Sequence, residues 1–307
     1  MKRFPDSIGW GNWGGLMCDE ELFAPLVAEV LARCGLPARA PSAGFPGTHA
    51  VFLTGDAVIK LYAPLGLPDA EIERAAYRAA AAAGVPRLPR LLGEGEIERE
   101  GRTWPFIALS KVVGSPTREC WPALSAERRN RVAAAAGEWM AGYHGLADPL
   151  PAGHPLGRHR WPGEFDRLTR KNADRLLDAG WPAALVEELL RAAAGLRGAK
   201  PVWVHGDLTE DHLLVDGDNL SIIDLADSRM APAQYEWPAL LFGGLRGDYR
   251  ALNACAAAAG LPAPGAPGIA ASAMIHLYGA PILLGAPGDS PPADFDALCA
   301  KIAESGR

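Results

Sequence analysis

Cysteine is scarce in this chain and follows no pattern. The five cysteines among its 307 residues are scattered, and no two of them form a C-x-x-C pair. An odd and dispersed set argues against a disulfide framework and against a zinc site built on cysteine. The chain is long enough to bury a substantial core, so ordinary side-chain packing is expected to hold its fold.

Excess positive charge and long apolar runs are lacking as well. The formal net charge is −6, which argues against a general affinity for nucleic acid or for an anionic membrane. Residues 1–18 are rich in Gly and Trp and have no continuous apolar core, so they do not read as a signal peptide. The longest apolar stretch, residues 269–284, is interrupted by polar residues and Pro281, and we interpret it as a buried helix. We therefore expect a cytoplasmic protein.

Strand patterns come first in this sequence and helical patterns follow. Before residue 113 the apolar spacing predicts helices at 19–34 and 68–83 and strands at 50–54, 57–62, 90–97 and 104–110. After it, the spacing predicts helices at 125–143, 164–177 and 183–196 and short strands at 202–204 and 222–224. One break, at residues 113–116, separates the two patterns. This order predicts an α+β fold with a sheet lobe, residues 1–112, and a helical lobe, residues 113–307.

The densest motif begins with His205-Gly206-Asp207 and continues to His212, and it is followed by an apolar strand that ends in Asp224. Two apolar strands that each end in an aspartate, joined by a short loop, bring two carboxylates together. Phosphoryl transfer needs one carboxylate to position the acceptor hydroxyl and another to hold Mg²⁺ on the nucleotide phosphates. Acidic turns after strands are also common in soluble proteins, so the pair alone leaves both interpretations open. We interpret His205 as support for the loop through hydrogen bonds.

A lysine at the end of an early apolar strand favours the catalytic interpretation. Residues 57–60 read Ala-Val-Ile-Lys and resemble the V-A-I-K strand whose lysine contacts the α- and β-phosphates of a nucleotide. On the next helix Glu73 is the expected partner of Lys60, and Glu71 is the competing candidate. Such pairs usually lie on the surface and contribute little. The position of Lys60 ahead of Asp207 and Asp224 makes the functional interpretation the better one.

Two further segments are candidates for nucleotide contacts. The loop Gly44-Phe-Pro-Gly47-Thr48 precedes an expected strand and would fold over phosphates, with backbone N–H groups and the Thr48 hydroxyl as donors. It lacks G-x-G-x-x-G, so an ordinary hairpin loop is an equal alternative. The segment at Ser110 and Val112 would connect the lobes, and its backbone would meet the adenine edge.

Residues 40–245, with these motifs in this order, resemble the aminoglycoside phosphotransferase superfamily of protein-kinase-like small-molecule kinases. The resemblance implies a two-lobed fold, with a small antiparallel-sheet N-lobe that binds nucleotide and a larger helical C-lobe that carries the catalytic loop and the acceptor site. It also implies that Asp207 is the catalytic aspartate, that Asp224 is the main Mg²⁺ ligand, and that Lys60 contacts phosphates. The segment Gln-Tyr-Glu236 is similar to hygromycin phosphotransferases, and Glu236 matches an acidic residue that secures the helical lobe.

One departure concerns His212, which stands where the family usually has the Asn of a second metal contact. We expect either that His212 ligates the metal, Mg²⁺ or Mn²⁺, or that it only packs in the loop. The sequence as a whole predicts an ATP- or GTP-dependent O-phosphotransferase. Its expected partners are a nucleoside triphosphate and a small-molecule hydroxyl acceptor. That acceptor is an aminoglycoside or related antibiotic, which implies antibiotic resistance, or else a sugar or amino alcohol.

Two other functions were weighed against this one. A nucleotide-binding pseudokinase with a regulatory role is favoured by His212 and disfavoured by the intact set of Lys60, Asp207 and Asp224. A protein kinase is disfavoured because no A-P-E segment follows Asp224.

Overall fold

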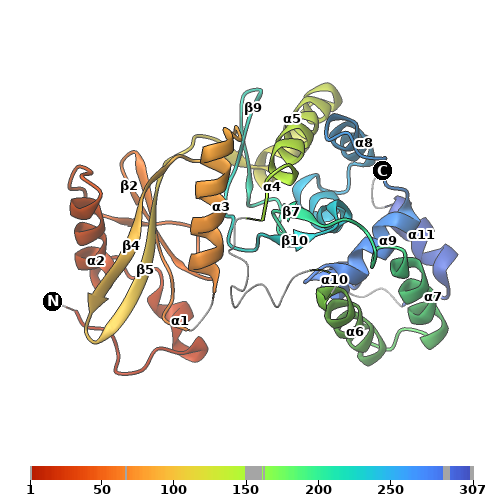
Figure 1. Cartoon of the computed structure of the whole chain (residues 1–307), viewed down its shortest axis with the longest axis horizontal. Coiled ribbons are helices and arrows are strands. Elements are labelled where there is room, and N and C mark those ends of the chain that lie inside the picture. Colours follow the sequence, from red (N-terminus) through yellow and green to blue (C-terminus); the bar gives the residue numbers. More distant parts are fainter. Residues whose placement is uncertain (1, 66–67, 149–160, 162, 286–290, 305–307) are drawn as a thin grey trace. The chain divides into compact units, whose positions relative to one another are not determined.

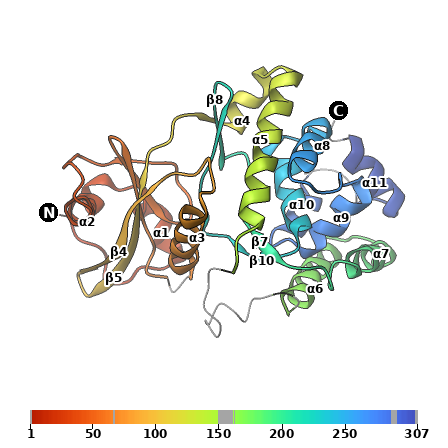
Figure 2. The same cartoon turned by 45° about the horizontal axis from the view of Figure 1, so that its top comes forward.

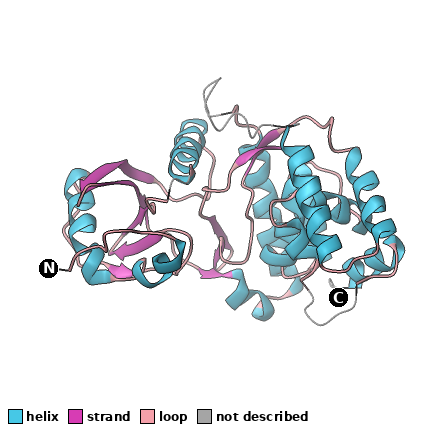
Figure 3. Cartoon of the chain, turned by 90° about the horizontal axis from the view of Figure 1, so that it is seen from below, coloured by secondary structure: helices cyan, strands magenta, loops and turns pink. Residues whose placement is uncertain are grey.

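The computed structural model describes residues 2–65, 68–148, 161, 163–285 and 291–304. The chain divides into two compact units. Unit 1 consists of residues 1–82 and 88–112, and unit 2 consists of residues 83–87 and 113–307. Strands dominate unit 1 and helices dominate unit 2 (Figures 1 and 3). The α+β fold class predicted from the sequence is confirmed.

Unit 1 is built on a five-stranded antiparallel sheet. Its strand order is β1-β2-β3-β5-β4, and the strands are β1 (Ser42–Ala43), β2 (Ala50–Thr54), β3 (Ala57–Leu61), β4 (Leu91–Arg99) and β5 (Arg102–Ser110). Strand β3 is the middle strand, so Lys60 faces Val51 on one neighbour and Ile107 on the other. A central strand has both edges hydrogen-bonded, which gives Lys60 a rigid base.

Helices α2 and α3 lie beside this sheet (Figure 1). Helix α2 (Glu20–Arg33) starts at Asp19, whose carboxylate accepts the N–H of Leu22 at 3.0 Å, and it contributes its aliphatic stripe to the aromatic core of unit 1. Helix α3 (Asp69–Ala83) carries Glu73, which it brings to Lys60 of the sheet. Residues at i and i+2 of a strand share a face, so Ile59 and Leu61 join the core while Lys60 points toward α3.

Helix α1 (Trp10–Leu16) was not predicted, because a segment with three glycines has low helix propensity. Trp13 explains why it forms. Its indole is 2 % exposed in the core, and its Nε1–H donates to the carbonyl of Thr48 at 2.8 Å. Burial of one large aromatic ring outweighs the propensity cost of the glycines.

Unit 2 consists mainly of helices and short helical turns. They are α4 (Thr117–Cys120), η1 (Trp121–Ala123), α5 (Ala126–His144), α6 (Gly163–Asp178), α7 (Ala183–Ala194), η3 (Ala233–Glu236), η4 (Ala239–Gly244), α8 (Tyr249–Ala258), α9 (Ala266–Ile275), α10 (Gly279–Leu283) and α11 (Phe295–Glu304). Helices α5 and α8 lie side by side (Figure 2). Gly137 permits their close approach, since a Cβ there would lie 2.1 Å from the carbonyl oxygen of Cys255.

Two small antiparallel sheets in unit 2 frame the segment from His205 to Asp224. One has the order β6-β8-β9, with β6 (Ser115–Pro116), β8 (Leu213–Asp216) and β9 (Asn219–Ile222), and the other pairs β7 (Val202–Val204) with β10 (Arg229–Ala231). The strand predicted at 222–224 was wrong. Strand β9 ends at Ile222, and Asp224 has a φ of +65, a left-handed conformation that a strand does not contain.

The apolar stretch 269–284 was predicted to be one buried helix, and that prediction was wrong in its continuity. Helix α9 ends at Ile275, His276 is extended with a ψ of 145, and α10 starts at Gly279. The break has a physical cause in α6, where the side-chain amide of Asn172 donates to the carbonyls of Ala273, Met274 and His276. These acceptors would otherwise remain unpaired at the end of α9. In the part of the chain that the structure describes, no helix is long and apolar enough to cross a membrane.

Candidate active site

The segment His205-Gly206-Asp207 follows β7 directly and is held by one buried carboxylate. Glu236 of η3 is fully buried, and its Oε1 accepts the N–H of His205 at 2.6 Å while Oε2 accepts the N–H of Gly206 at 3.2 Å. Burial opposes ionisation, but His144, His205 and the His205 amide outweigh it and lower the pKa of Glu236. Charge-assisted hydrogen bonds of this kind are roughly twice as strong as neutral ones. Glu236 therefore fixes the backbone immediately before Asp207.

Gly206 is required by the path of the chain at this point. Its φ is +87, and a Cβ on it would lie 2.4 Å from the carbonyl oxygen of Asp227. Any other residue would be strained and would push the segment after Asp224 away from the loop. Gly206 thus lets the loop before Asp207 lie against the segment that contains Asp227.

His205 supports the loop through hydrogen bonds, as its interpretation from the sequence required. Its Nδ1 accepts the N–H of Asp207 at 3.2 Å, and its Nε2–H donates to the carbonyl of Ile223 at 3.0 Å. Burial lowers the pKa of His205 to about 4, so the ring is neutral at physiological pH and holds one tautomer. One imidazole therefore ties the catalytic segment to the residue before Asp224.

Asp207 lies in a setting that makes its carboxylate more basic. Its side chain is 21 % exposed. Burial raises the pKa of Asp207 to about 6, with further contributions from Asp227, Asp224 and Glu236, whereas His212 acts in the opposite direction. A carboxylate with a pKa near 6 is ionised at pH 7 and still accepts a proton readily. This is the property that a general base needs.

His212 lies between the two aspartates. Its Nδ1 is 2.7 Å from the carbonyl oxygen of Asp207 and 3.3 Å from Asp207 Oδ2, and its Nε2 is 3.9 Å from Asp224 Oδ2. A carbonyl can only accept, so Nδ1 carries the proton in the neutral ring and Nε2 presents a lone pair on the side of Asp224. The assignment of the tautomer follows from this hydrogen bond.

These donors fit a divalent cation only as part of a larger shell. Ligands about 2.1 Å from one cation can be up to about 4.2 Å apart, and the distance from His212 Nε2 to Asp224 Oδ2 is within this limit. Over the described ranges of the chain, no group of three or more His, Cys, Asp or Glu side chains could hold a metal ion. A metal at Asp224 would therefore need further oxygen ligands, such as nucleotide phosphates and water.

In unit 1, Lys60 and Glu73 form the ion pair that the sequence suggested. Lys60 Nζ lies 2.8 Å from Glu73 Oε2, and the two residues are 6 % and 0 % exposed. The hydroxyl of Tyr62 donates to the same carboxylate oxygen at 2.6 Å. Tyr62 was missed in the sequence, although its position two residues after Lys60 on one face of the chain could have indicated it. Together these contacts orient the Lys60 ammonium.

The other residues predicted to contact nucleotide also lie in unit 1. Gly47 and Thr48 are exposed in the loop before β2, where the Thr48 carbonyl is held by Trp13. Ser110 ends β5, and its N–H donates to the carbonyl of Arg90 while its hydroxyl accepts the N–H of Arg90, both at 2.9 Å. Its carbonyl oxygen is then the backbone group that Ser110 can offer to a base, and Val112 follows on the same connection.

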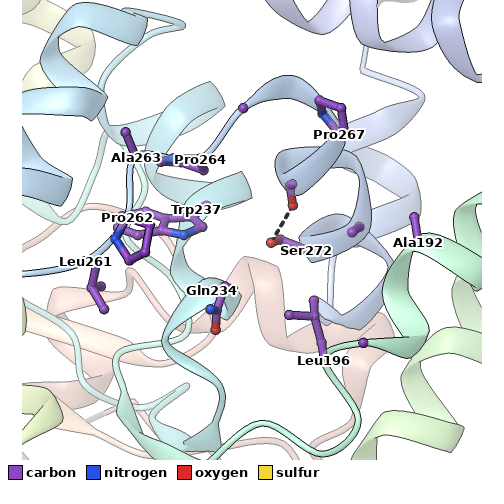
Figure 4. Close-up of a pocket in the computed structure, with 14 residues that line it drawn as sticks. Ala192, Leu196, Gln234, Trp237, Leu261, Pro262, Ala263, Pro264, Pro267 and Ser272 are labelled. Atoms are coloured by element: carbon purple, nitrogen blue, oxygen red, sulfur yellow. Dashed lines mark hydrogen bonds between the residues drawn. The ribbon is translucent and has the colours of Figure 1, made fainter.

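A separate cavity of about 430 Å³ lies elsewhere in unit 2, between α7, η3 and the connection from α8 to α9 (Figure 4). Trp237, Leu261 and several prolines line it, and the Ser272 hydroxyl donates to the carbonyl of Gly268. None of the residues predicted for the active site lines this cavity. Trp237 was interpreted in the sequence as a packing residue, and it is 2 % exposed.

Several solved protein structures share the fold of this chain. The chain is similar in structure to aminoglycoside 2'-phosphotransferase-IIIa in its GDP complex, with 15% identity, a TM-score of 0.61, and coverage of 92% of this chain and 97% of that one. The streptomycin–ATP ternary complex of APH(2")-IIa gives 14% identity and a TM-score of 0.60 with 92% and 96% coverage. A choline/ethanolamine kinase family protein from Mesorhizobium loti gives 18% identity and a TM-score of 0.58 with 94% and 95% coverage. At these identities the likeness establishes a shared fold.

The sequence itself matches a family model. Residues 41–269, well over half of the chain, match the model described as the phosphotransferase enzyme family. This range includes Lys60, Glu73, Asp207 and Asp224. The chain therefore belongs to the phosphotransferase enzyme family, and it is a small-molecule kinase.

Proposed function

We propose that this protein transfers the γ-phosphate of ATP or GTP to a hydroxyl group of a small molecule, with Asp207 as the catalytic carboxylate. The observation that carries the proposal is the setting of Asp207. Glu236 holds the backbone before it, and burial raises its pKa to about 6. Asp207 would accept the proton of the acceptor hydroxyl as that oxygen attacks phosphorus. General-base catalysis of this kind is worth roughly 10² to 10⁴ in rate.

The residues of unit 1 would bind the nucleotide. Lys60, aimed by Glu73, would contact its phosphates, and the Gly47 and Thr48 backbone would donate N–H groups to them. The carbonyl of Ser110 and the N–H of Val112 would meet the edge of the base. Backbone groups of this kind do not by themselves distinguish adenine from guanine.

Asp224 and His212 would hold Mg²⁺ or Mn²⁺ through Asp224 Oδ2 and His212 Nε2. A bound divalent cation would neutralise charge that develops on the phosphate oxygens. The hydrogen bond from Nδ1 to the Asp207 carbonyl would orient the imidazole for this contact. Because Mg²⁺ prefers oxygen ligands, a nitrogen ligand would shift the preference toward Mn²⁺.

The test is release of ADP or GDP by the purified protein, supplied with ATP or GTP and a panel of acceptors. Aminoglycosides come first, since solved neighbours include complexes with kanamycin and streptomycin, followed by sugars and amino alcohols. We expect acceptor-dependent release that Asp207→Asn reduces at least about 100-fold. Turnover by Asp207→Asn above a tenth of the wild-type rate would exclude the assigned role.

A nucleotide-binding pseudokinase is the second candidate, because His212 occupies the place of the expected Asn. The two functions differ in one measurable respect. A pseudokinase would bind nucleotide tightly and release no product with any acceptor, and His212→Asn would then be expected to create turnover. The kinase proposal predicts turnover in the wild-type protein.

A further inference from the structure

Three basic side chains in unit 2 form a cluster around Tyr235 and Leu277. Arg167 and Lys171 lie one turn apart on α6, and Arg229 begins β10. The Lys171 ammonium donates to the carbonyl of Leu277 at 3.0 Å, and the N–H of Leu277 donates to the Tyr235 hydroxyl at 2.9 Å. We call Arg167, Lys171 and Arg229 the cationic cluster.

Arg229 joins this cluster from the other side of Tyr235. Its guanidinium lies over the Tyr235 ring, 5.3 Å from the ring centroid. A cation over an aromatic face is attracted by the ring quadrupole and keeps its charge. The Leu277 carbonyl therefore holds Lys171, and the Tyr235 ring holds Arg229.

The cluster lies close to the catalytic segment within the same unit. Arg229 pairs with Val204 in the β7–β10 ladder, and Val204 is the residue before His205-Gly206-Asp207. The Arg229 Nε–H donates to the carbonyl of Asp227 at 3.0 Å, and that carbonyl packs against Gly206. Arg229 is therefore connected to the loop that carries Asp207 both through its strand pairing and through the Asp227 carbonyl.

The charges of the cluster are not balanced. Arg167 forms two bonds of 2.7 Å to Glu164, and Arg229 lies 3.5 Å from Asp227 Oδ1. Among described residues, Lys171 has no carboxylate within ion-pair distance, and its ammonium donates to the carbonyl of Leu277.

An ammonium has three N–H groups, so the carbonyl leaves two of them for a ligand. The pKa of Lys171 is lowered first by burial and then by the nearby Arg175, Arg167 and Arg229, which agrees with a locally positive potential. A partly buried cation without a counter-charge is unfavourable unless a ligand supplies one.

We propose that the cationic cluster binds an oxyanion, a carboxylate or phosphate group, of the acceptor molecule. This is the molecule whose hydroxyl proton Asp207 would accept. This proposal rests on the proposed function and narrows its acceptor class. Lys171 would donate its two remaining N–H groups to the oxyanion, and Arg229 and Arg167 would add charge around it. A hydroxylated acid or a sugar phosphate fits this arrangement. A polycation would be repelled by the uncompensated charge of Lys171.

The first experiment measures binding of inorganic phosphate by calorimetry at constant ionic strength, with Mg²⁺-ADP saturating. Lys171→Gln keeps an N–H donor for the Leu277 carbonyl and removes the charge, and Lys171→Arg restores the charge. Arg170→Gln, at an exposed position of the same helix, is the matched control. We expect Lys171→Gln to weaken phosphate binding by about tenfold or more. The Arg170→Gln and Lys171→Arg variants should remain within about threefold of the wild type. Equal affinity in wild type and Lys171→Gln, or no binding by the wild type, would overturn the proposal.

The second experiment measures product release with matched acceptors: glycerol, glycerate, glycerol 3-phosphate and kanamycin. We expect kcat/KM to be about tenfold higher for an acid or phosphate than for glycerol, and Lys171→Gln to remove the difference through KM. Glycerate and glycerol 3-phosphate distinguish a carboxylate from a phosphate. A preference for kanamycin that Lys171→Gln leaves unchanged would overturn the proposal. Absence of product release with every acceptor, and without any, would instead contradict the proposed function, and the phosphate-binding result would still decide the anion site.

Discussion

Lys60 and Glu73 form a buried ion pair, and removing one partner should destabilise the protein more than removing both. The two side chains are 8 % and 1 % exposed, and their charged atoms are 2.8 Å apart. Loss of one partner leaves the other charge in a medium that solvates it poorly, which costs about 3 kcal/mol or more. Replacement of both by apolar residues of similar volume is often close to neutral. The perturbations are Lys60→Met, Glu73→Leu and the double variant.

The structure sets the expected size of each effect. Each single variant should lower the free energy of unfolding by about 3 kcal/mol, since each leaves a buried charge without its counter-charge. The double variant should lose only about 1 kcal/mol, because the Tyr62 hydroxyl still loses its acceptor on Glu73. The double variant should therefore fall short of the sum by at least about 2 kcal/mol, a direct sign of coupling.

The assay combines urea unfolding with product release. All variants that lack Lys60 should lose transfer by roughly 100-fold or more, including the double variant, which is nearly as stable as wild type. Glu73→Leu should lose less, because Lys60 remains but is no longer aimed. Tyr62→Phe is the comparison within the site; it should lose about 1 kcal/mol and less activity than Glu73→Leu, because the ion pair itself remains.

Two results would refute this reasoning. Additive losses of stability in the double variant would mean that Lys60 and Glu73 do not compensate each other. A double variant with near wild-type turnover would mean that Lys60 does not contact the phosphates. Glu127→Leu, which removes one of two exposed partners of Arg131, should change stability by less than about 0.5 kcal/mol and sets the scale for a surface pair.

Three more predictions concern unit 2. Because the pKa of Asp207 is raised to about 6 from 3.8, the folded protein binds a proton there more tightly than the unfolded chain, and stability falls as pH rises from about 4 to about 6. Asp207→Asn should therefore stabilise the nucleotide- and metal-free protein by up to about 3 kcal/mol at pH 8 and not at pH 3, while wild-type activity should fall below about pH 6. Glu236→Gln should lower the free energy of unfolding, measured in urea, by about 2 kcal/mol and reduce turnover. The glutamine has one acceptor oxygen, so one of the two backbone N–H groups loses its hydrogen bond. His212→Asn should keep activity and shift the metal preference from Mn²⁺ toward Mg²⁺ in product-release assays.

Each of these has an outcome that contradicts it. A pH-independent effect of Asp207→Asn on stability would show that folding does not raise the pKa of the Asp207 carboxyl. Unchanged turnover in Glu236→Gln would mean that catalysis does not require both hydrogen bonds from the backbone before Asp207 to Glu236. Identical metal preference and pH profile in wild type and His212→Asn would remove His212 from the metal shell and leave the kinase assignment untouched.

Much of the fold was predictable because its signals are local. Helix α2 and strands β2 and β3 follow from apolar spacing over a few residues, together with a capping Asp19 and turn residues. The strand wrongly extended to Asp224 shows the limit of such signals. Two isoleucines before an aspartate predict a strand, but Asp224 has a left-handed φ, and the carbonyl of Ile223 before it is hydrogen-bonded to His205 of the loop.

The sequence by itself determined the order and chemistry of the site: a lysine on an early strand, a glutamate on the next helix, and two aspartates after later strands. Only the tertiary structure decided how these groups act. It places Glu236, thirty residues beyond Gly206, on the amides before Asp207, and it turns one nitrogen of His212 toward Asp224. It also gathers Lys171 and Arg229 around Tyr235, although they are far apart in the chain. Spacing along a chain reports which residues share a face of one element, whereas burial, pKa and tautomer depend on neighbours that other elements supply.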